Sequence, residues 1–421
     1  MDLIFAEATP PGRGGISIIR LSGSGARDVA ERLVGPLPVA RRTYCRNISE
    51  DGDVLDQALV FRAEEGASFT GEDLCEFHLH GAPVVVRRVS AALARAGARP
   101  AQAGEFTRRA FLNGRLDLAE IEGLGDLLAA ETEAQRQQAI RSSSGELAQK
   151  AAEWRKILVR AGALVEASVD FAEEDAPDEV PAETYGLIAD LTKRLQDELQ
   201  GFAAAERVRL GFEVAIIGPP NAGKSSLLNR LARRDAAIVS EIAGTTRDVL
   251  ELRMDLRGLA VTVLDTAGIR DAGDDIERMG IDAARKRAQA ADLRIHLSPS
   301  GARVDDLWRD GDLVVQSKSD LFDPQVDLAI SALTGSGIAE VLTSLFEILS
   351  SRVSGAGLIS HERQFRELSE ALAALDGAAD YPAEILAEQL RMAAFSLDRL
   401  LGRIDSEDYL DVIFSSFCIG K

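Results

Sequence analysis

The residues best suited to chemistry lie in a glycine-bounded loop near the middle of the chain. Gly218, Gly223, Lys224 and Ser225 match the pattern G-x-x-x-x-G-K-[ST], after a short apolar run and before a helical pattern. Glycines let backbone N–H groups turn toward phosphate oxygens, and the helix N-terminus adds a positive dipole end. We expect Lys224 to bind the β- and γ-phosphates and Ser225 to bind Mg²⁺. The spacing predicts a nucleotide site.

Two later motifs predict the parts of this site that respond to the γ-phosphate. In Gly244-Thr-Thr-Arg-Asp248, Thr246 can bind Mg²⁺ only while a γ-phosphate holds the segment closed, which is a switch. Asp265-Thr-Ala-Gly268 follows the apolar run 260–264. Asp265 is expected to orient the Mg²⁺ shell, and the Gly268 N–H to meet the γ-phosphate.

Two further motifs predict that the base is guanine. Ser317-Lys-Ser-Asp320 follows the apolar run 313–315, and Ser331-Ala-Leu333 follows 328–330. Asp320 can bind both N–H groups of guanine, and a backbone N–H of the second motif can meet its O6. Each motif alone is weak, but four in this order indicate GTP. The predicted GTP site comprises Asn221, Ala222, Gly223, Lys224, Ser225, Ser226, Ser240, Glu241, Ile242, Ala243, Gly244, Thr245, Thr246, Asp265, Thr266, Ala267, Gly268, Lys318, Asp320, Ser331 and Ala332.

The hydrophobic pattern predicts the elements that position these motifs. Strands are expected at 2–8, 16–21, 57–62 and 73–79, with helices at 25–33 and 83–96. From Leu118 the pattern becomes helical, with a break at 142–145, an acidic linker at 173–179 and a second apolar stripe at 187–199. Strand patterns occupy 213–331, and helices are expected again at 337–352, 361–379, 383–402 and 406–413.

The predicted fold class is therefore multidomain, α/β and α. An N-terminal α+β domain is expected at 1–117. A discontinuous helical domain is expected at 118–210 and 351–421, and a Ras-like P-loop G domain at 211–350 is inserted between its halves.

Composition narrows the class of protein. The chain has 421 residues and a formal net charge of −20, which argues against broad non-specific binding to nucleic acids. Three cysteines suggest no disulfide framework, and no long apolar run or signal peptide is apparent. We therefore expect a cytoplasmic protein. His78 and His80 are expected to be packed or hydrogen-bonded and not metal ligands.

Motifs outside the nucleotide site carry a more specific resemblance. The chain resembles the bacterial tRNA-modifying GTPases of the MnmE/TrmE family over essentially its whole length. The matching stretches are Ala8-Thr-Pro-Pro-Gly-Arg-Gly-Gly15, Ser68-Phe-Thr-Gly-Glu-Asp73, Gly104-Glu-Phe-Thr-Arg-Arg-Ala-Phe-Leu-Asn113, Pro220-Asn-Ala-Gly-Lys-Ser-Ser-Leu-Leu-Asn229 and Phe414-Ser-Ser-Phe-Cys-Ile-Gly-Lys421.

The resemblance implies how GTP is hydrolysed. Ile269 stands where many GTPases have a water-positioning glutamine, and Glu277 matches the family's water-orienting glutamate. The chain has no obvious arginine finger of its own, although Arg247 and Arg270 are candidates. The family is understood to bind K⁺ when two G domains meet, which supplies the charge of an arginine finger. The positions matching its K⁺ ligands are Asn221, Ser240, Ile242 and Thr245.

The resemblance also implies a folate site in the N-terminal domain. The matching residues are Arg20, Glu76, Arg115 and Lys421, which would bind a 5-formyl- or methylene-tetrahydrofolate. Cys418 would lie near this pocket and take part in its chemistry, while Cys45 and Cys75 are given no role. Without the resemblance, the first four would be surface ion-pair residues and Cys418 a bystander thiol.

The activity implied is tRNA modification. A homodimer would form a heterotetramer with a flavin-dependent partner of the MnmG/GidA type. Together they would add an aminomethyl or carboxymethylaminomethyl group to C5 of the wobble uridine (position 34), using a folate one-carbon unit. Two alternatives stay open: a GTPase switch for RNA or ribosome assembly without modification chemistry, and a folate enzyme regulated by GTP.

The sequence departs from the family pattern at two places. Ser317 stands where the guanine motif normally has Asn, and Ser is too short to bridge the base and the phosphate loop. The segment Ser298–Asp312 is short and lacks an apolar helical stripe, so we expect the usual helix to be trimmed there.

Overall fold

The computed structural model describes residues 2–170, 180–233, 251–265 and 285–404, together with positions 413, 414, 417 and 420. The chain forms two compact units. The first contains Met1–Gly125, Ala148–Arg155 and Arg391–Lys421, and the second contains Asp126–Leu147 and Lys156–Leu390. Within the described ranges, no helix is both long and apolar enough to cross a membrane.

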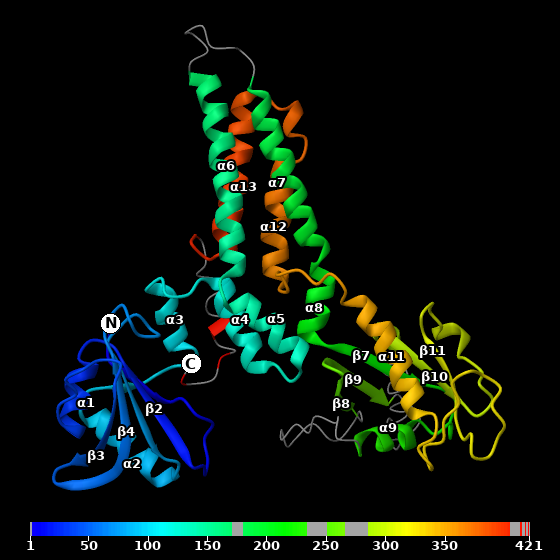
Figure 1. Cartoon of the computed structure of the whole chain (residues 1–421), viewed down its shortest axis with the longest axis horizontal. Coiled ribbons are helices and arrows are strands. Elements are labelled where there is room, and N and C mark those ends of the chain that lie inside the picture. Colours follow the sequence, from blue (N-terminus) through cyan, green and yellow to red (C-terminus); the bar gives the residue numbers. More distant parts are fainter. Residues whose placement is uncertain are drawn as a thin grey trace, which may run out of the picture. The chain divides into compact units, whose positions relative to one another are not determined.

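A six-stranded sheet forms the N-terminal part of the first unit (Figure 1). The strand order is β3-β4-β5-β2-β1-β6, and only β1 and β6 pair in parallel. The four strands expected from the sequence are confirmed. β3 was missed because it alternates polar and partly buried residues without a regular apolar face. The strands are β1 (Ile4–Glu7), β2 (Ile16–Ser22), β3 (Thr43–Glu50), β4 (Asp53–Ala63), β5 (Leu74–His80) and β6 (Arg99–Pro100).

The two faces of this sheet are covered unequally. Helices α1 (Ala26–Val34) and α2 (Pro83–Arg95) bury one face, where Ile19, Leu21 and Phe77 join their core. Helix α3 (Glu105–Leu112) inserts Phe106 against Ile4 on the other face. Because side chains alternate along a strand, Arg20 and Glu76 lie on this second face. The sheet therefore presents a charged surface opposite its main core.

The helical part is built from segments on both sides of the inserted domain. In the second unit, α7 and α12 lie side by side (Figure 1), and Phe202 of α8 packs on Phe365 of α12 with 4.6 Å between the ring centres. This packing confirms a discontinuous helical domain, and the break expected at 142–145 is also confirmed. The acidic linker and nearly all of 406–413 lie outside the described residues. The helices are α4 (Leu118–Ala129), α5 (Glu133–Ser143), α6 (Glu146–Asp170), α7 (Ala182–Gln200), α8 (Phe202–Leu210), α12 (Glu362–Leu375), α13 (Ala383–Leu400) and the 3₁₀ turn η2 (Ala378–Asp380).

The inserted domain is a five-stranded sheet in the order β11-β10-β7-β9-β8. Its pairs are parallel except for the β8–β9 hairpin. Helices α9 (Lys224–Ala232) and α11 (Ile338–Arg352) pack on one face, where Leu227, Val341 and Leu345 join the core. The strands are β7 (Phe212–Ile217), β8 (Glu251–Leu256), β9 (Leu259–Asp265), β10 (Leu293–Ser298) and β11 (Leu313–Gln316). A parallel sheet of this kind places its ligand at the carboxyl ends of the strands.

The connection from β10 to β11 contains no α-helix, as the sequence predicted. All of 298–312 is described, and its regular structure is one 3₁₀ turn, η1 (Asp305–Leu307). A buried ion pair fixes the ends of this connection: Arg294 Nε donates to Asp312 Oδ2 at 2.7 Å. His296 lies beside the pair, fully buried, and its ring is 5.3 Å from that of Trp308. Polar contacts thus hold a segment too short to bury a helical stripe.

Candidate functional site

The loop between β7 and α9 has the geometry of a phosphate cradle. Gly218 lies so close to the Leu297 carbonyl that no Cβ fits there, and Gly223 has a φ of 98°, which favours glycine. Asn221 has a φ of 62° and is exposed at the tip of the loop. The glycines are therefore required by the backbone, and the loop leads directly into the N-terminus of α9.

Lys224 and Ser225 are held in position beneath this loop. Lys224 is only 6% exposed, and its Nζ donates to the carbonyls of Gly218 (2.8 Å) and Pro219 (2.9 Å). Ser225 Oγ donates to Asp265 Oδ2 at 2.6 Å, and Asp265 is buried at the end of β9. A hydroxyl and a carboxylate this close can share one Mg²⁺ shell. The pairing predicted from two motifs 40 residues apart is thus brought together by the sheet.

The segments predicted to read the base converge at the same edge of the sheet. The N–H of Ser317 donates to the Ser298 carbonyl (2.9 Å), and that of Ser319 donates to Ile330 (3.0 Å). Lys318 has a φ of 58°, while Asp320 is exposed and Ser331 is buried. These backbone contacts place the two motifs next to one another.

Ser317 itself is buried beside the phosphate loop. It is 4% exposed, and its Oγ finds no hydrogen-bond partner in the described part of the chain. A Cβ built on Gly223 would be 4.0 Å from the Ser317 Cβ. The position is therefore adjacent to the loop, as the bridging role of an Asn would require, but its side chain makes no bridge.

Several predicted site residues cannot be placed. Ser240, Glu241, Ile242, Ala243, Gly244, Thr245, Thr246, Thr266, Ala267, Gly268, Glu277, Cys418 and Lys421 lie outside the described residues, as do Arg247, Ile269 and Arg270. Their roles stay predictions.

The first unit brings two of the four predicted folate residues together. Arg20 and Glu76 are cross-strand partners on β2 and β5, and their side chains form an ion pair at 2.9 Å. The Arg20 guanidinium lies 5.3 Å from the centre of the Phe69 ring and 5.6 Å from that of Phe106. The Arg20 side chain is therefore held both by its ion pair with Glu76 and by its contacts with two aromatic rings.

The C-terminal tail reaches the same place. Arg20 Nη1 donates to the Gly420 carbonyl at 3.4 Å, and Gly420 packs against the backbone at Glu7 so closely that a Cβ would not fit. Arg115 is exposed; its Nη1 donates to the Gly66 carbonyl at 3.1 Å, on the loop that carries Phe69. Gly420 lies between the predicted residues Cys418 and Lys421 in the sequence.

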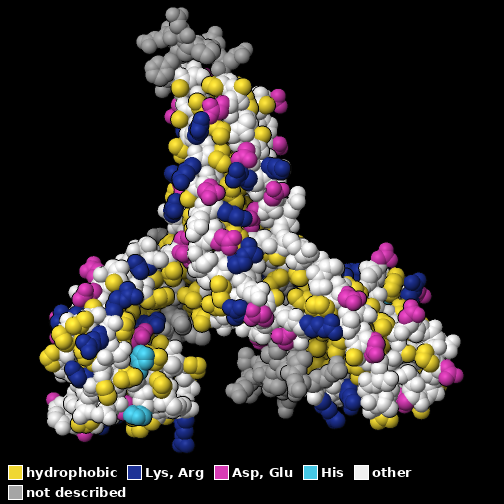
Figure 2. Space-filling view, viewed as in Figure 1, with side chains coloured by type: hydrophobic (Ala, Val, Ile, Leu, Met, Phe, Trp, Pro, Cys, Tyr) yellow, Lys and Arg dark blue, Asp and Glu magenta, His cyan; other side chains and the backbone are white. Residues whose placement is uncertain are grey.

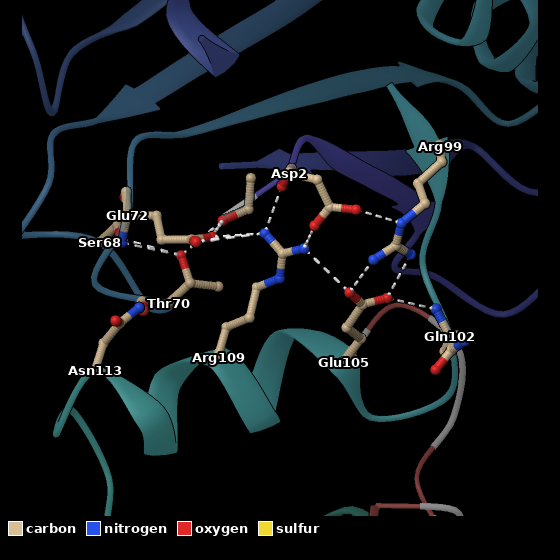
Figure 3. A network of polar contacts seen from close by, with 10 residues as sticks. Asp2, Ser68, Thr70, Glu72, Arg99, Gln102, Glu105, Arg109 and Asn113 are labelled. Atoms are coloured by element: carbon tan, nitrogen blue, oxygen red, sulfur yellow. Dashed lines mark hydrogen bonds and ion pairs between the residues drawn. The ribbon is translucent and has the colours of Figure 1, made fainter. Parts of the chain in front are cut away.

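A buried network around Arg109 fixes this loop, and sequence reasoning missed it (Figure 3). Arg109 is 3% exposed and donates to Glu72 (3.1 Å), Glu105 (3.0 Å) and Asp2 (2.7 Å). Asn113 Nδ2 donates to the Thr70 carbonyl at 2.7 Å. The stretches 68–73 and 104–113, which carry the family resemblance, thus meet here. The presence of both stretches in the sequence was the feature from which this network could have been predicted.

The charges in the network stabilise one another. Burial would raise the pKa of Glu105, but hydrogen bonds from Arg99, Gln102 and Arg109 outweigh it and lower that pKa. A hydrogen bond from Arg99 lowers the pKa of Asp2. By contrast, burial raises the pKa of the Cys75 thiol to about 12, so this cysteine is unreactive at neutral pH.

The fold and the loop define the class of protein. A parallel sheet, a glycine loop opening on Lys224 and Ser225, and Asp265 at the end of the neighbouring strand are the parts of a P-loop nucleotide-binding domain.

Comparisons with known proteins define the family. Residues 3–115 match the family described as GTP-binding protein TrmE N-terminus, and residues 118–418 match the MnmE helical domain. The protein named tRNA modification GTPase MnmE from Paracoccus denitrificans is 56% identical, and its namesake from Roseobacter denitrificans is 51% identical; each alignment covers 100% of both chains. A crystal structure of Era with MgGDPNP and 16S ribosomal RNA is 24% identical, with a TM-score of 0.26, over 32% of this chain and 56% of that chain. The chain belongs to the tRNA modification GTPase MnmE family. It is a GTPase that takes part in tRNA modification.

Proposed function

We propose that the chain, with a flavin-dependent partner, adds an aminomethyl or carboxymethylaminomethyl group to C5 of the wobble uridine of certain tRNAs. The carbon would come from a folate bound at Arg20, Glu76, Arg115 and Lys421. Hydrolysis of GTP on the inserted domain would order this chemistry by opening and closing pairs of G domains. The family membership supports the tRNA and GTP parts of the proposal.

The observation that carries the folate part is the meeting of Arg20, Glu76 and Gly420. A pterin offers N–H donors that a carboxylate such as Glu76 can accept, and glutamyl carboxylates suit arginine. The Arg20 guanidinium also contacts the rings of Phe69 and Phe106, so it is held in position by the protein. Gly420, 400 positions further along the chain, lies at this surface. A folate bound here would supply the one-carbon unit, and Cys418, which lies outside the described residues, is proposed to take part in its chemistry.

We also propose that the chain is a homodimer through its N-terminal sheet. Leu59 on β4 pairs in register with Cys45 and with His78, and Ile18 pairs with His78 from the other side. Leu59 is 48% exposed and Ile16 is 64% exposed, so this face offers apolar area to water. Figure 2 shows hydrophobic side chains near the histidines of this part. A second copy that pairs face to face would bury them.

The ions proposed for the G domain are Mg²⁺ and K⁺. Ser225 and Asp265 already share a hydrogen bond at the place where Mg²⁺ is expected. The exposed Asn221, at the tip of the loop, can offer an amide oxygen to K⁺, with Ser240, Ile242 and Thr245 as the other proposed ligands. We further propose domain boundaries at 1–117, 118–210, 211–350 and 351–421.

Deletion of residues 418–421 tests the proposed chemistry. Wobble-uridine modification, measured by mass spectrometry of tRNA nucleosides with the flavin partner present, should vanish, while GTP hydrolysis should persist. Arg20→Ala should give the same split, and Arg88→Ala serves as the control, because Arg88 lies on α2 at the other face of the sheet and its ion pair with Asp53 is exposed. If the tRNA is still modified after the deletion, the proposal is contradicted. If the full-length chain and its flavin-dependent partner modify no tRNA, a GTPase switch without modification chemistry is favoured.

A further inference from the structure

The β8–β9 hairpin links the nucleotide site to a turn at the opposite end of the two strands. β9 ends at Asp265, whose carboxylate binds Ser225, and it begins just after the turn. The turn residues Arg257 and Gly258 have φ values of 52° and 96°, the combination of a type I′ turn. Arg257 is also tied to α11: its Nη2 donates to Thr343 at 2.8 Å. The hairpin is therefore a stiff element with one end at the proposed Mg²⁺ site.

Helix α5 of the helical domain rests on this turn. The N–H of Ala134 lies in the first turn of α5, where a helix offers no internal acceptor, and it donates to the Gly258 carbonyl at 3.2 Å. Gln135 ties the same helix end to the entrance of the G domain, since its Nε2 donates to the Arg209 carbonyl at 3.0 Å. Both domains thus share one helix N-terminus.

The packing beside this contact is incomplete. A cavity of about 160 Å³ separates the start of α5 from the outer edge of the hairpin, and residues of both domains line it. Across it, Arg253 of β8 faces Glu131 with 3.5 Å between Nη1 and Oε1. A close-packed core resists small shifts, but a cavity that is half open to solvent next to one hydrogen bond leaves the hairpin room to tilt.

We propose that the contact between Ala134 and Gly258 is the joint through which the nucleotide site acts on the helical domain. A shift of Asp265 toward or away from a bound Mg²⁺ tilts the hairpin, and the turn at its other end then makes or breaks the hydrogen bond to α5. The role of this joint in tRNA modification rests on the proposed function, whereas the coupling between the nucleotide site and α5 does not depend on it.

Hydrogen exchange tests the joint in the unaltered chain. With K⁺ and Mg²⁺ present, protection of the Ala134 amide should differ about tenfold between GDP and a non-hydrolysable GTP analogue, a change typical of coupled sites. The last turn of α5 should exchange equally in both states. Equal protection of Ala134 in both states would overturn the proposal, whether or not tRNA is modified.

A reversible cross-link tests what the joint controls. A Cβ built on Gly258 lies 4.0 Å from the Glu133 Cβ, within the range of about 3.5–4.5 Å for disulfides. In Glu133→Cys/Gly258→Cys, oxidation should lower tRNA modification about tenfold while GTP hydrolysis stays within about twofold, and reductant should restore it.

The single variants Glu133→Cys and Gly258→Cys, treated with the same oxidant, control for the native thiols and for a side chain at a positive φ. Modification that is unchanged by the cross-link would overturn the coupling role. If the unaltered chain and its partner modify no tRNA, the proposed function fails and the exchange experiment still decides the joint.

Discussion

At the scale of single residues, the phosphate loop contains positions that tolerate no other residue, and beside it lies one position, Ser317, that can be changed. Gly218 cannot carry a side chain, and Lys224 and Ser225 are held by short contacts within the protein. Ser317 is different, because its hydroxyl is buried without a partner in the described part of the chain. A buried polar group without a hydrogen bond is a cost to folding, and here it is also a lost contact to the loop.

Ser317→Asn should tighten the binding of GDP. The longer amide can reach the phosphate loop near Gly223, and one added hydrogen bond is worth about 0.5–1.5 kcal/mol, or up to about tenfold in Kd. Titration with a fluorescent GDP analogue measures the change. Ser317→Ala, which removes the unpaired hydroxyl, should leave Kd nearly unchanged. If Ser317→Asn binds GDP no better than Ser317→Ala, the predicted hydrogen bond to the phosphate loop is contradicted.

At the scale of elements, the connection from β10 to β11 shows how a trimmed segment is held. Arg294 and Asp312 are both nearly fully buried, and Asp312 also accepts from the backbone N–H groups of Arg294 (3.0 Å) and Arg309 (2.8 Å). Burial alone would raise the pKa of Asp312, but these hydrogen bonds outweigh it and lower that pKa. The Asp312 carboxylate therefore holds this connection in place by hydrogen bonds, where a longer connection would be held by the apolar side of a helix.

Asp312→Ala should therefore destabilise the G domain strongly. It leaves the buried charge of Arg294 without its partner, which costs about 3–5 kcal/mol. Asp305→Ala is the matched control, because Asp305 pairs with Arg303 at 2.8 Å in the same connection but is exposed, and such pairs are worth about 0–1 kcal/mol. Urea unfolding measures both, followed by the fluorescence of Trp308 in a Trp154→Phe background. Similar losses in the two variants would argue against the network.

His296 predicts a pH dependence in the same element. Its Nδ1 accepts the Val304 N–H (3.0 Å), so the neutral ring donates from Nε2 to Asp312 (3.3 Å). Burial lowers the pKa of His296 below 6.5, although Asp312 partly opposes this. Below pH 6.5 the unfolded state then binds more protons than the folded state. The stability that this residue contributes should be complete above pH 6.5 and should be lost as the pH falls from there through the lower pKa of the folded state.

The measurement is the free energy of unfolding between pH 8 and pH 5, compared with His296→Gln. The difference between the two proteins should shrink as the pH falls. Curves that stay parallel over this interval would show that His296 does not titrate with folding.

At the scale of the whole molecule, two copies of the chain are proposed to meet at the N-terminal sheet and at the G domains. The first contact is expected to be permanent and the second to follow the nucleotide. The net charge of −20 is consistent with a division of labour in which the partner supplies much of the grip on tRNA.

Leu59→Glu should weaken the dimer, because it places a charge beside the exposed apolar side chains that a second copy would bury on this face of the sheet. Light scattering after gel filtration should then report a mass near that of one chain, 45.2 kDa. Val39→Glu is the control, since Val39 is as exposed, at 51%, but lies outside the strands of the sheet. Dissociation by both variants, or by neither, would contradict dimerisation through this face.

Hydrolysis of GTP should depend on K⁺. The rate in K⁺ should exceed that in Na⁺ by a factor on the order of ten to a thousand, as for other groups that supply a positive charge to the transition state. Glu277→Ala should lower the rate in K⁺ toward that in Na⁺ while GTP binding is kept. Equal rates in the two salts would exclude the cation mechanism.

The sequence alone determined the nucleotide loop, the order of the guanine motifs, the family and most helices and strands. These are local, because a loop pattern or an apolar stripe is read from neighbouring residues. Only the tertiary structure showed the contact between Gly420 and Arg20 and the network by which Arg109 connects two family motifs. It alone also showed the buried ion pair of Asp312 with Arg294 and the hydrogen bond between α5 and Gly258. Each of these is a contact between polar groups far apart in the chain, and no local periodicity encodes which distant partner a buried charge or an unpaired N–H will find.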